Sequence, residues 1–168
     1  MSTKQFIYSR VIALAVFICL IASAQHSTAQ VAQSKDGMFS LAVPPGWMPA
    51  QQPNVELSYN FPGPEPLIMY MVSEKKSQRD VLNDIRVAAD DVKTQPFTTG
   101  TGAAGTKISV RQPLSTPDTF IYQFYYLFSY KRATYALVFV SGICNSANSP
   151  ERMFDAIASS VSIGKRKR

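Results

Sequence analysis

The chain has 168 residues, a hydrophobic fraction of 46% and a formal net charge of +6, so one domain with its own apolar core is expected. The positive charge is concentrated at the ends of the chain. Of the 17 basic residues, two lie within the first ten positions and four form the C-terminal sequence Lys165-Arg166-Lys167-Arg168, and the other 11 balance the 11 acidic residues. A nucleic-acid-binding domain should carry a basic patch on its folded body. We therefore expect no nucleic-acid partner.

The N-terminus has the pattern of a secretory signal peptide. Two basic residues precede an apolar run over residues 11–22, and small residues follow it. This run is too short to span a membrane, which takes about 20 apolar residues. We predict a signal peptide over residues 1–24, cleaved after Ala24 or Ala29, and hence export to the periplasm or the extracellular space. An uncleaved membrane anchor is the alternative.

Apolar residues alternate with polar ones in the first half of the chain and predict strands there. The expected strands are Met38 to Val43, Val55 to Phe61 and Leu67 to Ser73. Residues 25–36 are polar and are expected to be frayed. The first strand ends at Pro44-Pro45-Gly46-Trp47, where the prolines remove ladder donors and the glycine permits a reversal. Trp47 is expected to fold back over the sheet edge, with ligand stacking as the alternative.

A helix is predicted to follow these strands. It begins at Ser77, which lies three residues before Asp80 in a capping pattern. Pro96 is expected to end it. Apolar residues recur at helical spacing and form the stripe expected to face the sheet, namely Val81, Ile85, Ala88 and Val92.

Residues 100–105 read Gly-Thr-Gly-Ala-Ala-Gly and match the glycine pattern of dinucleotide-binding proteins. That pattern holds a pyrophosphate only where a strand precedes it and a helix follows it. Here the next residues, Thr106 to Gln112, alternate as a strand does. We therefore predict a flexible turn and no cofactor site.

The longest predicted element is an aromatic β-hairpin from Thr119 to Ser141. Aromatic and β-branched residues at this density are typical of strands. Both faces of each arm are largely apolar, which is typical of strands inside a sheet that is covered on both sides. Phe124 and Phe139 are expected to be core residues, and the turn contains Lys131 and Arg132.

A second helix is predicted to start at Ser149-Pro150-Glu151, with a serine cap, a proline in the first position and an acidic first turn. Its buried stripe consists of Met153, Phe154, Ile157 and Val161. Residues 164–168 form a basic tail. Two interpretations of Lys165, Arg166, Lys167 and Arg168 stay open, namely a solvated end and a weak contact with an anionic membrane surface.

The expected domain offers few groups for catalysis. Its region contains no histidine, because His26, the only one, lies beside the predicted cleavage site. The commonest general base and zinc ligand are therefore missing. Cys144 is the only cysteine left after cleavage, and a buried inert thiol or an intermolecular bridge is expected. Paired aspartates are expected on the solvated face of the first helix, where no desolvation activates them; they are Asp80, Asp84, Asp90 and Asp91.

Several of these features occur together in one known family. The strand that ends in Pro-Gly-Trp at Phe39 to Trp47, the mid-chain helix, the aromatic hairpin and the closing helix resemble the PsbP-like family over residues 37–163. Its structural relatives include the Ran-binding Mog proteins. The resemblance implies an α+β fold, an α/β/α sandwich in which a central antiparallel sheet of about six strands lies between two main helices. It also implies an accessory or binding role without catalysis.

Two functional hypotheses follow. The first is an exported, non-catalytic accessory or binding domain that acts on an unidentified protein complex of the cell envelope. The second is a small-ligand or lipid carrier with an aromatic-lined cavity under the hairpin. A carboxylate-dependent hydrolase is a third alternative. We predict no catalytic residue, metal or cofactor, and the candidate binding residues are Trp47, Lys131 and Arg132.

Overall fold

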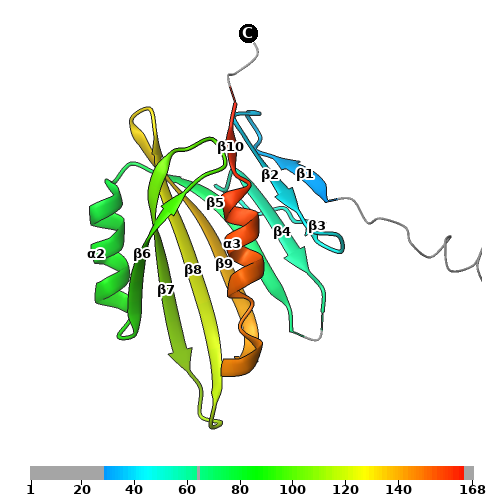
Figure 1. Ribbon diagram of the computed structural model, residues 1–168, viewed down its shortest axis with the longest axis vertical. Helices are drawn as coiled ribbons and strands as arrows, with labels where there is room; N and C mark the ends of the chain where they lie inside the picture. The colour runs from blue at the N-terminus through cyan, green and yellow to red at the C-terminus, as the bar shows by residue number, and fades with distance from the viewer. Residues whose placement is uncertain (1–28, 64, 165–168) are drawn as a thin grey trace, which may run out of the picture.

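The aromatic hairpin lies at the centre of the fold, as predicted. The computed structural model describes residues 29–63 and 65–164, and the arms of the hairpin are β8 (Thr119–Tyr130) and β9 (Ala133–Asn145). The other strands of this antiparallel sheet are β3 (Met48–Pro49), β4 (Leu57–Phe61), β5 (Leu67–Glu74), β6 (Val92–Thr98) and β7 (Ala104–Pro113). Their order is β3-β4-β5-β9-β8-β7-β6 (Figure 1), so the sheet has seven strands and not the expected six. The predicted signal peptide and residues 165–168 lie outside the described residues.

A second, smaller sheet was not expected from the sequence. It consists of β1 (Gln30–Gln33), β2 (Phe39–Val43) and β10 (Ser162–Ile163) in the order β1-β2-β10. The prediction that residues 30–33 are frayed is therefore wrong. These residues pair along their whole length with β2, and only Ala32 is buried while its neighbours in β1 are exposed. Backbone pairing with a buried strand orders a segment whose side chains carry almost no apolar pattern.

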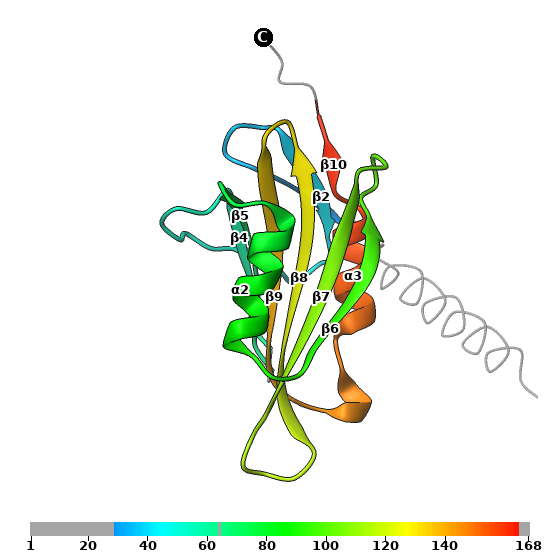
Figure 2. The ribbon, with the colours of Figure 1, turned by 90° about the vertical axis from the view of Figure 1, so that its left-hand side faces the viewer.

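Two helices cover opposite faces of the large sheet (Figure 2), which confirms a layered α+β arrangement. Helix α3 (Glu151–Ser159) and the small sheet lie on one face, and α2 (Gln78–Ala88) lies on the other. The core under α3 is large and aromatic, whereas the core under α2 is smaller and aliphatic. A short 3₁₀ helix, η1 (Ser146–Asn148), leads from β9 into α3.

Aromatic side chains from both arms of the hairpin fill the core under α3. The ring of Phe154 in α3 stacks on Phe139 in β9, with centroids 4.4 Å apart. Phe124 in β8 meets Phe154 edge-on at 5.6 Å. Phe39 of the small sheet lies 4.4 Å from the ring of Tyr135. These contacts join α3 and the small sheet to one face of the hairpin, and Phe124 and Phe139 are core residues as predicted.

The end of the first helix differs from the prediction. Ser77 caps α2 and accepts a hydrogen bond from the backbone N–H of Asp80, as expected, but α2 ends at Ala88. Val92 and Pro96 belong to β6, and Ala88 is exposed instead of facing the sheet. Proline is tolerated in β6 because this strand forms the edge of the sheet, where a missing N–H breaks no ladder.

Helix α3 begins close to the predicted position. Its first residue is Glu151, and Pro150 takes the cap position that the sequence assigned to Ser149. The Ser149 hydroxyl still accepts a hydrogen bond from the backbone N–H of Glu151 at 3.4 Å. The serine therefore supports the start of the helix from one position further out.

A buried lysine fixes α3 to the sheet. Lys107 in β7 is 5% exposed, and its Nζ lies 2.6 Å from Oε1 of Glu151 and 2.7 Å from Oδ1 of Asp155. Tyr126 in β8 donates its phenolic O–H to the same Asp155 oxygen at 2.7 Å. Burial and this hydrogen bond raise the pKa of Tyr126 far above its ordinary value. The phenol therefore remains a donor across the physiological range.

The Tyr126–Asp155 hydrogen bond predicts a pH-dependent effect of Tyr126→Phe. At pH 7 the variant should lose about 1 kcal/mol of unfolding free energy, since Asp155 is partly solvated. Above about pH 10 unfolding releases the phenolic proton of the parent protein, so the parent loses about 1.4 kcal/mol per pH unit from this group. The stability difference should shrink there and vanish near pH 11. Urea unfolding at pH 7, 10 and 11 measures it, and a constant difference would contradict the placement of Tyr126.

Candidate functional site

Helix α2 covers only part of its face of the large sheet. It has 11 residues, about 16 Å of helix, whereas β8 and β9 have 12 and 13 residues, about 40 Å of strand. Its apolar contacts with the sheet come from half-buried side chains, and none of its residues is buried. The strands therefore continue past the end of α2 with no helix above them (Figure 2).

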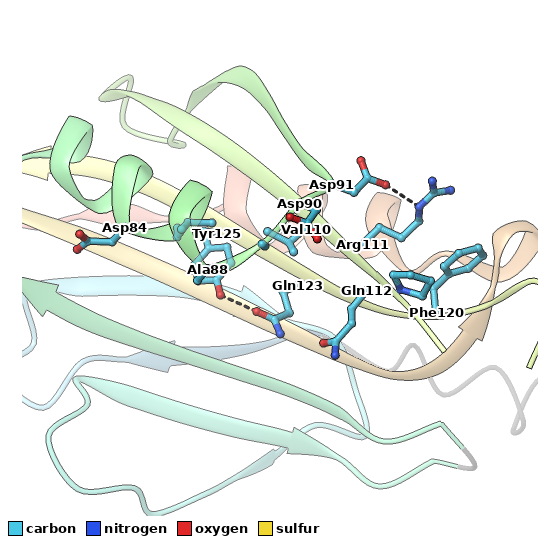
Figure 3. Close-up of a pocket in the computed structure, with 13 residues that line it drawn as sticks. Asp84, Ala88, Asp90, Asp91, Val110, Arg111, Gln112, Phe120, Gln123 and Tyr125 are labelled. Carbon is cyan, nitrogen blue, oxygen red and sulfur yellow. Dashed lines mark hydrogen bonds and ion pairs between the residues drawn. The ribbon is translucent and has the colours of Figure 1, made fainter. Parts of the chain in front are cut away.

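A cavity of about 700 Å³ opens at this end of α2. Its helical side is formed by Asp84, Ile85 and residues 88–91, which belong to the end of α2 and the turn that follows it. Its other side is formed by β7 and β8, and Gln112, Phe120 and Gln123 lie beyond the end of the helix (Figure 3). Tyr125 lies beneath the helix end. We call this cavity the α2-end pocket.

The polar groups of the α2-end pocket are arranged in pairs. Tyr125 donates its O–H to Oε1 of Gln123 at 2.6 Å. Arg111 donates from Nε to Oδ2 of Asp91 at 2.9 Å, and its guanidinium lies 4.7 Å from the centroid of the Phe120 ring. These contacts hold the side chains on the pocket wall in defined positions.

The pocket carries negative charge at the helical side. Asp84, Asp90 and Asp91 line it together with one cation, Arg111, and Lys76 outside the lining neutralises Asp84, so the local net charge is −1. Asp84 forms an ion pair with Lys76 at 2.5 Å, whereas Asp90 forms no hydrogen bond or ion pair with the residues that the structure describes. The last carbonyl groups of α2 point the same way and add partial negative charge. The pocket therefore favours a cationic group at its rim and an apolar group on its floor.

Two half-buried tyrosines near the pocket have raised pKa values. Burial raises the pKa of Tyr125, and the neighbouring Tyr70 raises it further. Burial likewise raises the pKa of Tyr70. Both phenols therefore stay protonated at neutral pH, and the O–H of Tyr125 is already donated to Gln123.

The three candidate binding residues from the sequence do not line the α2-end pocket. Trp47 is 3% exposed and packs on Phe61 with ring centroids 5.9 Å apart. Lys131 and Arg132 are exposed in the turn between β8 and β9. Lys131 has a φ of 56° there, and its ammonium lies 5.3 Å from the centroid of the Tyr130 ring. The structure leaves Trp47 almost no surface for a ligand, and a binding role for the two basic residues stays a prediction.

The residues of the pocket were missed because they lie far apart in the sequence. Only Gln123 could have pointed to the pocket from the sequence, since it is the only amide side chain in the aromatic strand β8. The sequence pattern predicts Asp90 and Asp91 on the solvated face of a longer helix. They lie instead in the turn after α2, where Asp91 reaches Arg111, 20 residues further along the chain.

Cys144 is buried, which is the first of the two states expected from the sequence, a buried inert thiol or an intermolecular bridge. It is a free cysteine and 3% exposed. Burial is the main cause that raises the pKa of its thiol, and Glu65 adds to the effect while Ser141 opposes it. The thiol therefore stays protonated and a poor nucleophile at neutral pH.

Two further findings concern metals and membranes. Among residues 29–63 and 65–164, no three His, Cys, Asp or Glu side chains are grouped so that they could hold a metal ion. Within the same residues, no helix has both the length and the apolar character that crossing a bilayer requires.

Solved structures resemble this chain, although no protein-family model and no curated protein matches its sequence. The Ran-binding protein Mog1p of Saccharomyces cerevisiae has a TM-score of 0.54 at 9% identity, over 82% of this chain and 96% of Mog1p. The fold is that of Mog1p. LpqN of Mycobacterium tuberculosis, involved in cell envelope biogenesis, has a TM-score of 0.52 at 11% identity, over 81% of this chain and 90% of LpqN.

A protein from Bacteroides thetaiotaomicron has a TM-score of 0.55 at 11% identity, over 82% of this chain. The match covers 49% of that protein, so this chain spans about half of its length. At these identities the likeness establishes the fold alone. It agrees with the Mog/PsbP-type fold that the sequence resemblance implied.

Proposed function

We propose that the protein is an exported, non-catalytic accessory domain that binds a protein complex of the cell envelope. The observation that carries this proposal is the α2-end pocket, a recess of about 700 Å³ on a sheet face that α2 covers incompletely. Two proteins of the same fold support it, since Mog1p binds Ran and LpqN is involved in cell envelope biogenesis. The signal-peptide pattern of residues 1–24 supports the location.

The chemistry of the pocket favours binding over catalysis. Two of its carboxylates are occupied, Asp84 by Lys76 and Asp91 by Arg111. The Tyr125 phenol is held neutral by burial and donates to Gln123. The remaining surface consists of the carboxylate of Asp90, aromatic and aliphatic side chains, and fixed hydrogen-bonding groups, which is the usual composition of a recognition site.

Photo-crosslinking in native cells tests this function. A benzophenone side chain is introduced in place of Gln112, which is exposed and lines the pocket, and in place of Arg152, which is exposed on α3 at the opposite face. The Gln112 site should capture one envelope protein at a fixed ratio, and the Arg152 site should not. A third probe at Lys131 tests the predicted role of the hairpin turn. Capture of no envelope protein from any of the three sites would contradict the accessory role.

A small-ligand or lipid carrier is the second candidate. The volume of the pocket falls within the range of about 300–1,000 Å³ that is usual for ligand sites, and Phe120 and Tyr125 supply aromatic wall. The face of the hairpin under α3 is less suited, because Phe154 fills the space against Phe124 and Phe139. Native mass spectrometry separates the two functions. A small molecule that stays bound to the protein purified from the envelope favours the carrier.

A further inference from the structure

The sheet face under α2 becomes progressively exposed toward the far end of β9. Ala136 and Val138 are 3% and 2% exposed beneath the helix. Val140 is half-buried, and Ile143 is 59% exposed. Ile143 is thus an aliphatic side chain on a central strand that faces solvent, where a layered fold normally places a covering element.

Neighbouring strands add half-buried aliphatic side chains to this region. Ile121 in β8 lies opposite Ile143, and Ile68 in β5 lies opposite Val140. Directly opposed residues of paired strands have side chains on the same face. Ile68, Ile121, Val140 and Ile143 therefore form one aliphatic surface across three adjacent strands, which we call the open strip. Gln123, opposite Val140, connects the open strip to the α2-end pocket.

The charge beside the open strip limits what can cover it. In the adjoining pocket Asp84 pairs with Lys76 and Asp91 with Arg111, so Asp90 is the one carboxylate there without a partner among the described residues. A second copy of this chain in a two-fold dimer would place the same carboxylates against each other. An anionic lipid surface would meet the same repulsion. Charge complementarity therefore favours an occupant with aliphatic side chains on one face and cationic side chains at its border.

We propose that a partner protein docks a basic amphipathic helix across the open strip, next to the end of α2. Its aliphatic face covers Ile143, Ile121 and Val140, and a lysine or arginine on its border reaches Asp90. A helix fits because α2 already covers the same sheet face and leaves the rest of it free. This inference rests on the proposed function, since it names the partner chemistry for the same face.

Model peptides test the docking surface. The probes are two fluorescent 14-residue amphipathic helices with leucine on one face and either lysine or glutamate on the other. Fluorescence anisotropy should show binding of the lysine peptide to the purified protein, and at least about tenfold weaker binding of the glutamate peptide. Ile143→Ser should lower the affinity for the lysine peptide about tenfold. Val31→Ser is the matched control, because Val31 is 68% exposed on the small sheet. It should leave the affinity for the lysine peptide unchanged.

The charge is tested separately from the apolar surface. Asp90→Asn should lower the affinity for the lysine peptide several-fold and reduce the salt dependence of its binding. Asp90→Lys should reverse the preference, so that the glutamate peptide binds better. Both variants change an exposed side chain in a turn, so the fold is expected to persist, and circular dichroism checks this.

Four results would overturn the inference. One is equal binding of the lysine peptide to the parent protein and to Ile143→Ser. Another is a dimer in sedimentation that Ile143→Ser dissociates, which assigns the strip to a second copy. The third is displacement of the peptide by phosphatidylcholine vesicles, which assigns it to lipid. The last is capture of the same envelope protein from Gln112 in cells carrying Ile143→Ser, which leaves the proposed function intact and rejects only this docking mode.

Discussion

Replacing Phe139 by alanine should lower the free energy of unfolding by about 3–5 kcal/mol. Phe139 is fully buried and lies where the hairpin meets α3. Its ring stacks on Phe154 at 4.4 Å and meets Tyr126 edge-on at 5.6 Å. The truncation therefore removes a large apolar surface and two aromatic contacts, and the surrounding strands cannot close the cavity. Phe124→Ala should fall in the same range, since Phe124 also contacts Phe154.

Equilibrium unfolding in urea, followed by circular dichroism, measures this loss. A loss of this size is a large part of the stability of a typical domain, about 5–15 kcal/mol. Phe120→Ala is the matched control, because Phe120 is also an aromatic residue of the hairpin but is only half-buried. It should cost clearly less. If Phe139→Ala melted within a degree of the parent, the hairpin would not be central to the fold.

The hairpin could be predicted because the apolar residues on both of its faces indicate that both faces are buried. Phe124, Tyr126 and Phe128 alternate with Tyr125 and Leu127, so both faces of β8 are apolar, and the structure covers both over that half of the strand. The resemblance to the PsbP-like family implied the layered α+β arrangement, and the two-sided apolar pattern of the hairpin agreed with it. The two-sided burial of the hairpin itself depends on local periodicity, which one sequence is sufficient to show.

The end of α2 could not be predicted in the same way. Val92 continues the helical spacing set by Val81 and Ile85, so the periodicity suggested a longer helix. The competing factor is pairing of residues 92–98 with β7 along the edge of the sheet. An edge strand accepts Pro96, and its formation is decided by tertiary contacts that the local pattern does not contain.

The pocket and the open strip both arise from the early end of α2. Both exist because α2 stops at Ala88 while β8 and β9 continue, a mismatch of lengths between elements far apart in the chain. A register shift between Ile121 and Gln123 then sets Ile143 opposite Ile121. The alternation in the sequence says which residues are apolar. It does not say which of them remain uncovered, and that is what determines where a partner can bind.

Gly105→Ala should be severely destabilising, by about 3 kcal/mol, the upper end of what overpacking usually costs. A Cβ atom built on Gly105 would lie 2.0 Å from the carbonyl oxygen of Leu127. That atom belongs to the neighbouring backbone, and Gly105 is paired with Phe128 in β8 and with Phe97 in β6. The clash can be relieved only by separating β7 from β8.

Gly164→Ala is the matched control for Gly105→Ala. The added methyl group would lie 3.8 Å from the nearest atom, the carbonyl oxygen of Met38, which is ordinary contact. Its effect should stay within about 0.5 kcal/mol. Urea unfolding of both variants gives the comparison, and equal midpoints would mean that β7 and β8 are not in close contact at Gly105. A large loss of stability in Gly105→Ala would also show that strand packing requires the last glycine of residues 100–105. No bound nucleotide is then needed to explain that glycine.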